Sequence, residues 1–197
     1  MRHQPIKNKL FIENRKRLAK LLAPKSLAVL NANDVLPTNA DGTLVMQPNA
    51  DLFFLSGIEQ EESVLVLFPD APEEKNREIL FLREPNDHLK IWEGHKHTKA
   101  EAKKISGIKN VQWLSAFPMM FRALMCEAEA AYLNSNEHKR AVVEVETRDA
   151  RFSRQCRRDF PLHDYRRLAP LLHQLRVVKT NLELELLKEA VDITGRG

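Results

Sequence analysis

The sequence has 197 residues, of which 43% are hydrophobic and 29% are charged, and its formal net charge is only +4. That length suits one domain with a substantial core, and the composition excludes a disordered chain. No apolar run approaches the roughly 18 residues of a membrane-spanning helix and no secretory signal opens the chain, so we expect a cytoplasmic protein without membrane partners.

The first predicted elements are an amphipathic helix over residues 8–22 and a buried strand over residues 26–31. In the helix, Phe11 and the leucines that follow it lie on one face. The basic side chains, including that of Arg15, are expected mostly off this face and in solvent. After a polar loop we expect a short strand over residues 43–46.

The stretch over residues 47–69 is the centre of the predicted fold. Its apolar run, residues 64–68, lacks polar alternation, which is typical of a strand buried on both faces. Gly57 is expected to adopt a positive φ before the acidic turn 59–62, whose glutamates we expect to be solvated. A strand over residues 78–83 follows a hairpin-like turn, so part of the sheet is predicted to be antiparallel.

The most chemically varied segment covers residues 84–97 and combines three histidines with two carboxylates, from which a zinc site can be built. These residues are His88, His95, His97, Asp87 and Glu93. We expect the order His95-Lys96-His97 to place the two imidazoles on opposite sides of an extended chain. The favoured interpretation is therefore exposed loop histidines and no metal site.

Trp92 lies in the same segment and admits two interpretations. A tryptophan flanked by polar residues and followed by Gly94 can plug a core. It can equally form the wall of a binding pocket from a loop, because its ring is large and amphipathic. The residues alone leave both interpretations open.

Helices and strands continue to alternate in the second half. A helix over residues 98–106 begins with a capping box from Thr98 to Glu101, and Gly107 ends it. A strand over residues 110–114, an apolar helix over residues 116–128 and a strand over residues 130–134 follow. The methionines of that apolar helix, at helical spacing with phenylalanines, favour a place in the core.

The composition then becomes rich in arginine, and five arginines recur at helical intervals. They are Arg148, Arg151, Arg154, Arg157 and Arg158. Such a stripe can bind phosphates or nucleic acid, but the acidic residues among them favour a surface of salt bridges, solvated or between subunits.

Two helices complete the prediction. Residues 163–178 are expected to form a helix that Pro170 kinks near its middle. Residues 180–193 are expected to form an amphipathic helix, which a capping box from Thr180 to Glu183 opens. Because nothing after this helix covers its apolar face, we expect a truncated chain.

The sequence contains no self-contained catalytic set. Its six glycines form no phosphate-binding loop, and neither GxSxG nor HExxH occurs. Cys126 and Cys156 offer no CxxC spacing, and we expect both to be reduced. The residues alone therefore predict a layered α/β domain without catalytic residues.

Three pieces, in this order, resemble the N-terminal domain of the creatinase/aminopeptidase P group of proline-specific metallopeptidases. NADLFFLSG at residues 49–57 is similar to the family's N-S-x-F-x-Y-L-T-G, and IWEG at residues 91–94 is similar to its W-x-G. Residues 175–194 are similar to the L-R-x-x-K-S stretch with which the catalytic domain begins. Phe54 and Ser56 replace a usual tyrosine and threonine, and both changes keep the size of the side chain.

The resemblance implies a three-layer α/β/α domain with a mixed, ribonuclease H-like sheet over residues 1–160. Residues 161–197 would then be a linker and the first helix of a pita-bread catalytic domain. The family's two divalent metal ions, usually manganese, are held by two Asp, one His and two Glu, which would lie beyond residue 197. This chain would thus hold no metal and no catalytic residue.

The resemblance also implies a role for the domain in an Xaa-Pro aminopeptidase. In the family it restricts the cleft to short peptides with proline in the second position, and it builds contacts within dimers or tetramers. Trp92 of the W-x-G piece, with His95 beside it, is accordingly expected to bind substrate. One alternative is a noncatalytic interaction module of the same fold in a homologue that has lost its metal ligands. Nucleic-acid binding through the arginine stripe is a further, disfavoured alternative.

Overall fold

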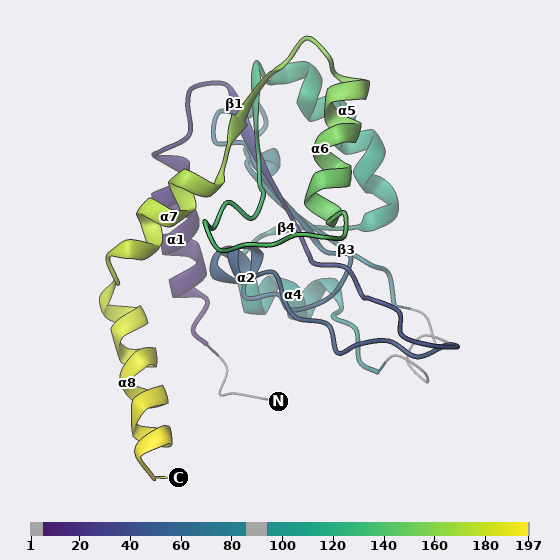
Figure 1. Cartoon of the computed structure of the whole chain (residues 1–197). Coiled ribbons are helices and arrows are strands. Elements are labelled where there is room, and N and C mark those ends of the chain that lie inside the picture. Colours follow the sequence, from purple (N-terminus) through teal and green to yellow (C-terminus); the bar gives the residue numbers. More distant parts are fainter. Residues whose placement is uncertain (1–5, 86–93, 197) are drawn as a thin grey trace.

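A mixed sheet of six strands lies between two layers of helices in the computed structural model, which describes residues 6–85 and 94–196 (Figure 1). The strands stand in the order β4-β3-β2-β1-β5-β6. They are β1 Ser26–Asn31, β2 Val64–Leu67, β3 Glu78–Leu82, β4 Asn110–Trp113, β5 Ala130–Leu133 and β6 Asp164–Arg167. The helices are α1 Lys9–Ala19, α2 Ala50–Ser56, α4 Lys99–Ser106, α5 Phe117–Glu127, α6 Arg148–Asp159, α7 Ala169–Val177 and α8 Asn181–Arg196, with 3-10 turns at Glu74–Asn76 and Leu114–Ala116.

The strand directions confirm the predicted mixed sheet. β2 pairs antiparallel with both β1 and β3. The connection from β2 to β3 contains only the 3-10 turn Glu74–Asn76, so these two strands form a hairpin. β3 pairs parallel with β4, and β1 pairs parallel with β5, which in turn pairs parallel with β6. Helices lie in the connections to β4, β5 and β6, as parallel pairing requires.

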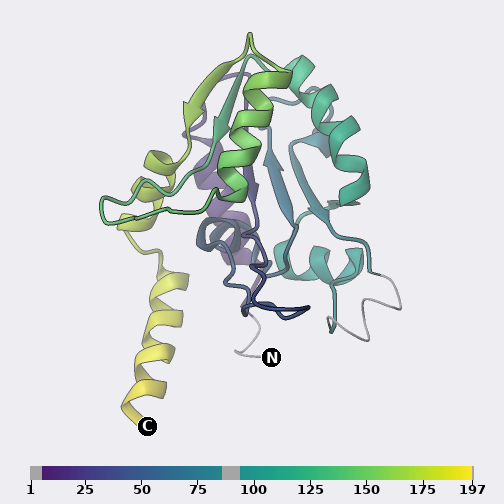
Figure 2. The same cartoon turned by 45° about the vertical axis from the view of Figure 1, so that its right-hand side comes forward.

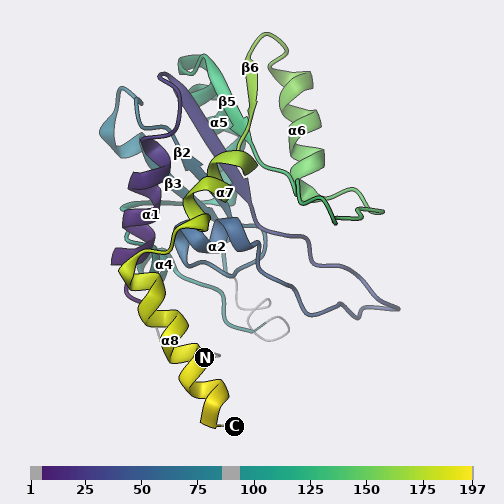
Figure 3. The ribbon, with the colours of Figure 1, turned by 60° about the vertical axis from the view of Figure 1, so that its left-hand side comes forward.

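The two helix layers cover opposite faces of the sheet, as Figures 2 and 3 show from two sides. Leu30 of β1 packs in a cluster with side chains from α1, α2, α4 and α7. Its neighbour Val29 packs in a second cluster with side chains from α5 and α6. Both leave the central strands fully buried, so the prediction of a three-layer α/β/α core is confirmed.

Polar side chains of α1 bind the carbonyl ends of three other helices. Arg15, predicted to be solvated, is only 1% exposed: its Nη1 donates to the carbonyl oxygens of Leu55 at 2.7 Å and Ser106 at 3.0 Å. Its Nε lies 3.0 Å from Glu78 Oε2. Arg17 donates to the Leu175 carbonyl at 2.8 Å. A cation is favourable at these ends, because each carries unpaired carbonyls and a partial negative charge.

The ends of α2 and α4 that Arg15 joins are built alike. Both helices finish in Ser-Gly-Ile, with the glycine in the left-handed conformation at φ 70° for Gly57 and 73° for Gly107. The Ser56 hydroxyl donates to the carbonyl of Leu52 and accepts from the Ile58 amide. At the end of α4, the Ser106 hydroxyl likewise donates to the carbonyl of Ala102 and accepts from the Ile108 amide. A side chain at Gly57 would meet the Phe11 ring at 2.4 Å, so α1 sits directly on this turn.

Two predicted elements are wrong. Residues 43–46 form only an isolated bridge between Thr43 and Pro37, and Val45 is exposed, because no sheet edge adjoins the segment. The helix predicted over residues 163–178 is strand β6 followed by α7. Pro170 lies in the first turn of α7, where its missing amide leaves no hydrogen bond unmade, and it causes no kink.

The C-terminal segment, from residue 161, first adds to the sheet and the core and then ends in a helix that projects from them. The predicted division at residue 160 stays a prediction, while the residues beyond it add β6 to the sheet and Leu172 of α7 to the core. α8 has the predicted capping box, but it projects from the body and buries no residue (Figure 1). Among the described residues, no helix is long and apolar enough to cross a membrane.

Replacing Arg15 with methionine should destabilise the protein substantially. Methionine keeps the length of the side chain but leaves the carbonyls of Leu55 and Ser106 buried without a donor. We expect the free energy of unfolding in urea to fall by about 3 kcal/mol. The matched control Lys16→Met changes an exposed neighbour and should cost less than about 0.5 kcal/mol. Equal losses in the two variants would contradict the anchoring role of Arg15.

Candidate functional site

The loop before α4, residues 94–98, is fixed by the acidic turn that precedes β2. Lys96 is 8% exposed, and its Nζ lies 2.5 Å from Glu61 Oε1. The His97 amide donates to Gln60 Oε1 at 2.7 Å. Glu61 was predicted to be solvated, but it is buried and also lies 3.5 Å from Arg83 Nη1. Both anchors come from the turn, so the loop has a defined position.

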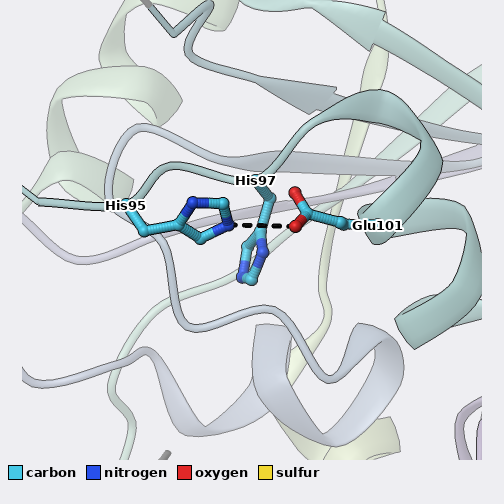
Figure 4. Close-up of side chains that lie close together, drawn as sticks. All are labelled: His95, His97 and Glu101. Carbon is cyan, nitrogen blue, oxygen red and sulfur yellow. Dashed lines mark ion pairs between the residues drawn. The ribbon is translucent and has the colours of Figure 1, made fainter. Parts of the chain in front are cut away.

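His95 and His97 point toward Glu101, which stands in the first turn of α4 (Figure 4). His95 Nε2 lies 3.1 Å from Glu101 Oε1, and the two imidazole centroids are 5.9 Å apart. The prediction that these rings lie on opposite sides of the chain is wrong. Side chains two residues apart in an extended segment share a side, and it is Lys96 between them that points the other way into the protein.

The charge states of the cluster follow from its hydrogen bonds and burial. Glu101 Oε2 accepts from the Thr98 amide at 2.8 Å and from its hydroxyl at 2.9 Å, and these two bonds lower the pKa of this carboxyl. The Glu101 amide donates in turn to the Thr98 hydroxyl at 3.2 Å, which completes the predicted capping box. Burial lowers the pKa of His97 despite the nearby carboxylates. Near pH 7 the Glu101 carboxylate therefore stands beside a neutral His97 imidazole.

The substrate-binding roles of His95 and Trp92 both stay predictions. His95 has an accessible side chain, 64% exposed, at the edge of the fixed loop. Trp92 lies outside the described residues, as do His88, Asp87 and Glu93 of the same segment. Both interpretations of Trp92 therefore remain predictions.

A polar cleft of about 840 Å³ opens where β1 and β5 end. On one side Arg176 Nη1 lies 2.7 Å from Asp51 Oδ1, and Asn134 donates to the other oxygen of that carboxylate at 3.2 Å. On the other side Asp149 lines the cleft and accepts a hydrogen bond of 2.8 Å from Asn31, at the end of β1. The carboxyl ends of parallel strands commonly hold ligands, but here most polar groups bind one another.

The arginine stripe on α6 borders this cleft. Arg151 Nη2 lies 2.6 Å from Asp34 Oδ1, and Arg154 forms an ion pair with Glu146. These pairs favour the interpretation as a salt-bridged surface within one chain. Arg148 is half-buried and donates to the Glu62 carbonyl at 3.3 Å.

Burial also sets the chemistry of two other groups on α6. It raises the pKa of Asp149 to about 6, against an ordinary 3.8, although the bond from Asn31 opposes the shift. It raises the pKa of the Cys156 thiol to about 12, so this cysteine is no nucleophile. Cys126 and Cys156 are both free thiols.

Comparison with known proteins points to one family. Residues 11–133 match the profile of the aminopeptidase P N-terminal domain. Over 189 residues the chain is 24% identical to the Xaa-Pro aminopeptidase of Escherichia coli, an alignment that covers 94% of this chain and 42% of that protein. A candidate aminopeptidase P from Bacillus anthracis has a TM-score of 0.82 and 28% identity over 93% of this chain and 43% of its own. Zinc-substituted E. coli aminopeptidase P in complex with product has a TM-score of 0.75 and 24% identity over 97% of this chain and 43% of its own.

These relatives are much longer than this chain. The chain spans less than half the length of each of them. The similarity to the E. coli structure, at 24% identity, establishes the fold alone.

Asp149 should make stability depend on pH. Because its pKa is raised on folding, its contribution is complete below about pH 4 and is lost as the pH rises through 6. Between pH 5 and pH 7 the free energy of unfolding should fall by about 1 kcal/mol more in the wild type than in Asp149→Asn. Urea denaturation at both pH values measures this, with Asp192→Asn on α8 as the control. Parallel pH profiles for wild type and Asp149→Asn would contradict the assignment.

Proposed function

The chain belongs to the aminopeptidase P N-terminal domain family, and we propose that it is the substrate-restricting and assembly domain of a metal-dependent Xaa-Pro aminopeptidase. The observation that carries this proposal is the alignment of nearly the whole chain with an Xaa-Pro aminopeptidase. The parent enzyme would release the N-terminal residue of a peptide whose second residue is proline.

The division of labour in this proposal follows from what the chain contains. Two divalent metal ions, manganese in our proposal, would polarise the scissile carbonyl, and we assign their ligands to residues outside this chain. This chain would instead shape the entrance for short peptides. We infer that it has no catalytic residue of its own.

The fixed loop before α4 is the part that we assign to substrate. Lys96 and the His97 amide hold it to the buried turn, so His95 projects from a defined position. Trp92, three residues earlier in the sequence, would add the apolar wall that a short peptide requires. A side chain on this loop, such as that of His95, can restrict substrates by shape, because the loop cannot move without breaking both contacts.

The exposed apolar side chains of α8 fit its proposed place as the first helix of the catalytic domain. Leu187 is 47% exposed and Val191 is 68% exposed on a helix that buries no residue in this chain. Such a face is stable in water only when other protein covers it. We propose that the parent enzyme forms dimers or tetramers and works in the cytoplasm.

Substitution in the loop should separate substrate binding from chemistry. In the full-length enzyme, Trp92→Ala and His95→Ala should each raise KM for an Xaa-Pro peptide about tenfold and leave kcat and metal content unchanged, because they remove binding common to ground and transition states. His138→Ala, an exposed histidine elsewhere, is the control. The assay measures release of the first residue in the presence of manganese.

Two other outcomes are informative. An unchanged KM with a lower Tm in Trp92→Ala would identify this side chain as a core plug. No release from any Xaa-Pro peptide by the full-length wild type would favour the alternative, a noncatalytic interaction module.

A further inference from the structure

We propose that His95, His97 and Glu101 form a binding site for one divalent transition-metal ion, with zinc as the best match. The three side chains each offer one ligand atom, and these atoms all lie within 4.8 Å of one another. They come from one short stretch of chain, so the site depends on the local fold of the loop and the first turn of α4 (Figure 4).

The distances suit zinc after a small adjustment. Zinc holds imidazole nitrogens and carboxylate oxygens at about 2.1 Å, so two ligands at the tetrahedral angle lie about 3.4 Å apart. His95 Nε2 and Glu101 Oε1, at 3.1 Å, already meet that spacing. The other ligand atoms lie within 4.8 Å of one another, so small rotations of the side chains, of which that of His95 is 64% exposed, would bring them to this spacing.

The rest of the site is already in place. The His97 amide is bonded to Gln60, which fixes the backbone from which one imidazole projects. Glu101 Oε2 is held by the Thr98 amide and hydroxyl, and this leaves Oε1 directed at the histidines. Residues that bind a metal are commonly oriented by hydrogen bonds from neighbouring groups, and these two bonds orient the Glu101 carboxylate in the same way. The carboxylate also offsets the partial positive charge at the start of α4.

The ligand set selects the class of ion. Two imidazoles and one carboxylate suit zinc and its neighbours in the transition series, whereas calcium and magnesium require oxygen ligands. Three protein ligands leave one tetrahedral position for water or another donor. Without a metal the cluster has only the exposed contact between His95 and Glu101, which contributes little to stability.

A bound metal ion would tie the loop to α4 more tightly than the contact between His95 and Glu101 does. The loop carries His95, so zinc would change how that side chain can reach a peptide. This consequence follows from the proposed function, but the metal site itself does not depend on it.

Zinc binding by the 197-residue chain without an affinity tag tests the site. Isothermal titration should give about one zinc ion per chain for the wild type and for the control His138→Ala. His97→Ala and His95→Ala should each bind at least about tenfold more weakly, since losing even an indirect partner of a metal costs that much. Both variants should keep their fold, because the anchoring amide of His97 and the capping box remain. Circular dichroism checks this, and zinc should raise Tm in the wild type but not in His97→Ala.

Three results would overturn the proposal: no saturable zinc binding by the wild type, unchanged affinity in His97→Ala, or an equal loss in His138→Ala. Magnesium, titrated in parallel, should not bind. None of these readouts uses peptide cleavage, so failure of the proposed function and failure of the metal site can be told apart.

Discussion

The fold depends on the side chains with which α1 binds the carbonyl ends of other helices. A short helix ends in carbonyls without partners. The last residues of α2 and α4, Ser56 and Ser106, are fully buried, so water cannot supply the missing donors. One guanidinium, that of Arg15, serves both ends. Asn14 binds the Phe54 carbonyl at 3.0 Å, and Arg17 extends the pattern to α7. The first helix thereby aligns three others along one face of the sheet.

The candidate site inherits its geometry from this arrangement. The turn that carries Gln60 and Glu61 begins directly after the end of α2, and α4 carries Glu101. Arg15 holds the ends of both helices, so it sets the distance between the turn and α4. The loop with His95 and His97 spans that distance and is anchored on the turn. The buried hydrogen bonds of Arg15 therefore position His95 and His97, although Arg15 does not contact either histidine.

Sequence patterns predicted most of the sheet and failed at identifiable points. Strands β1, β2, β3 and β5 were predicted from apolar runs, which indicate burial on both faces of the sheet. β4, with the sequence NVQW, was predicted as well, although only Val111 in it is buried. β6 was missed because it is a largely exposed edge strand, and its sequence, DYRR, contains no apolar run. The burial of Arg15 could not be predicted, since its partners are backbone carbonyls that come close only in the tertiary structure.

The candidate site was only partly predictable for similar reasons. His95 and His97 were recognised, and correct use of the two-residue period would have placed them on one side. The position of Glu101 beside Thr98 follows from the capping box, which the sequence does show, but its contact with His95 does not. The burial of Glu61 and Lys96 depends on a contact between distant segments.

Hydrogen exchange by NMR tests most directly whether Arg15 positions the loop. In the wild type, the amides of Gly57, Gly107 and His97 should all be protected, because each is bonded within this connected set. In Arg15→Met the account predicts that His97 loses protection together with the two glycines, although it lies outside the altered contact. Retained protection at His97, with loss confined to the helix ends, would contradict the claim that α1 positions the site.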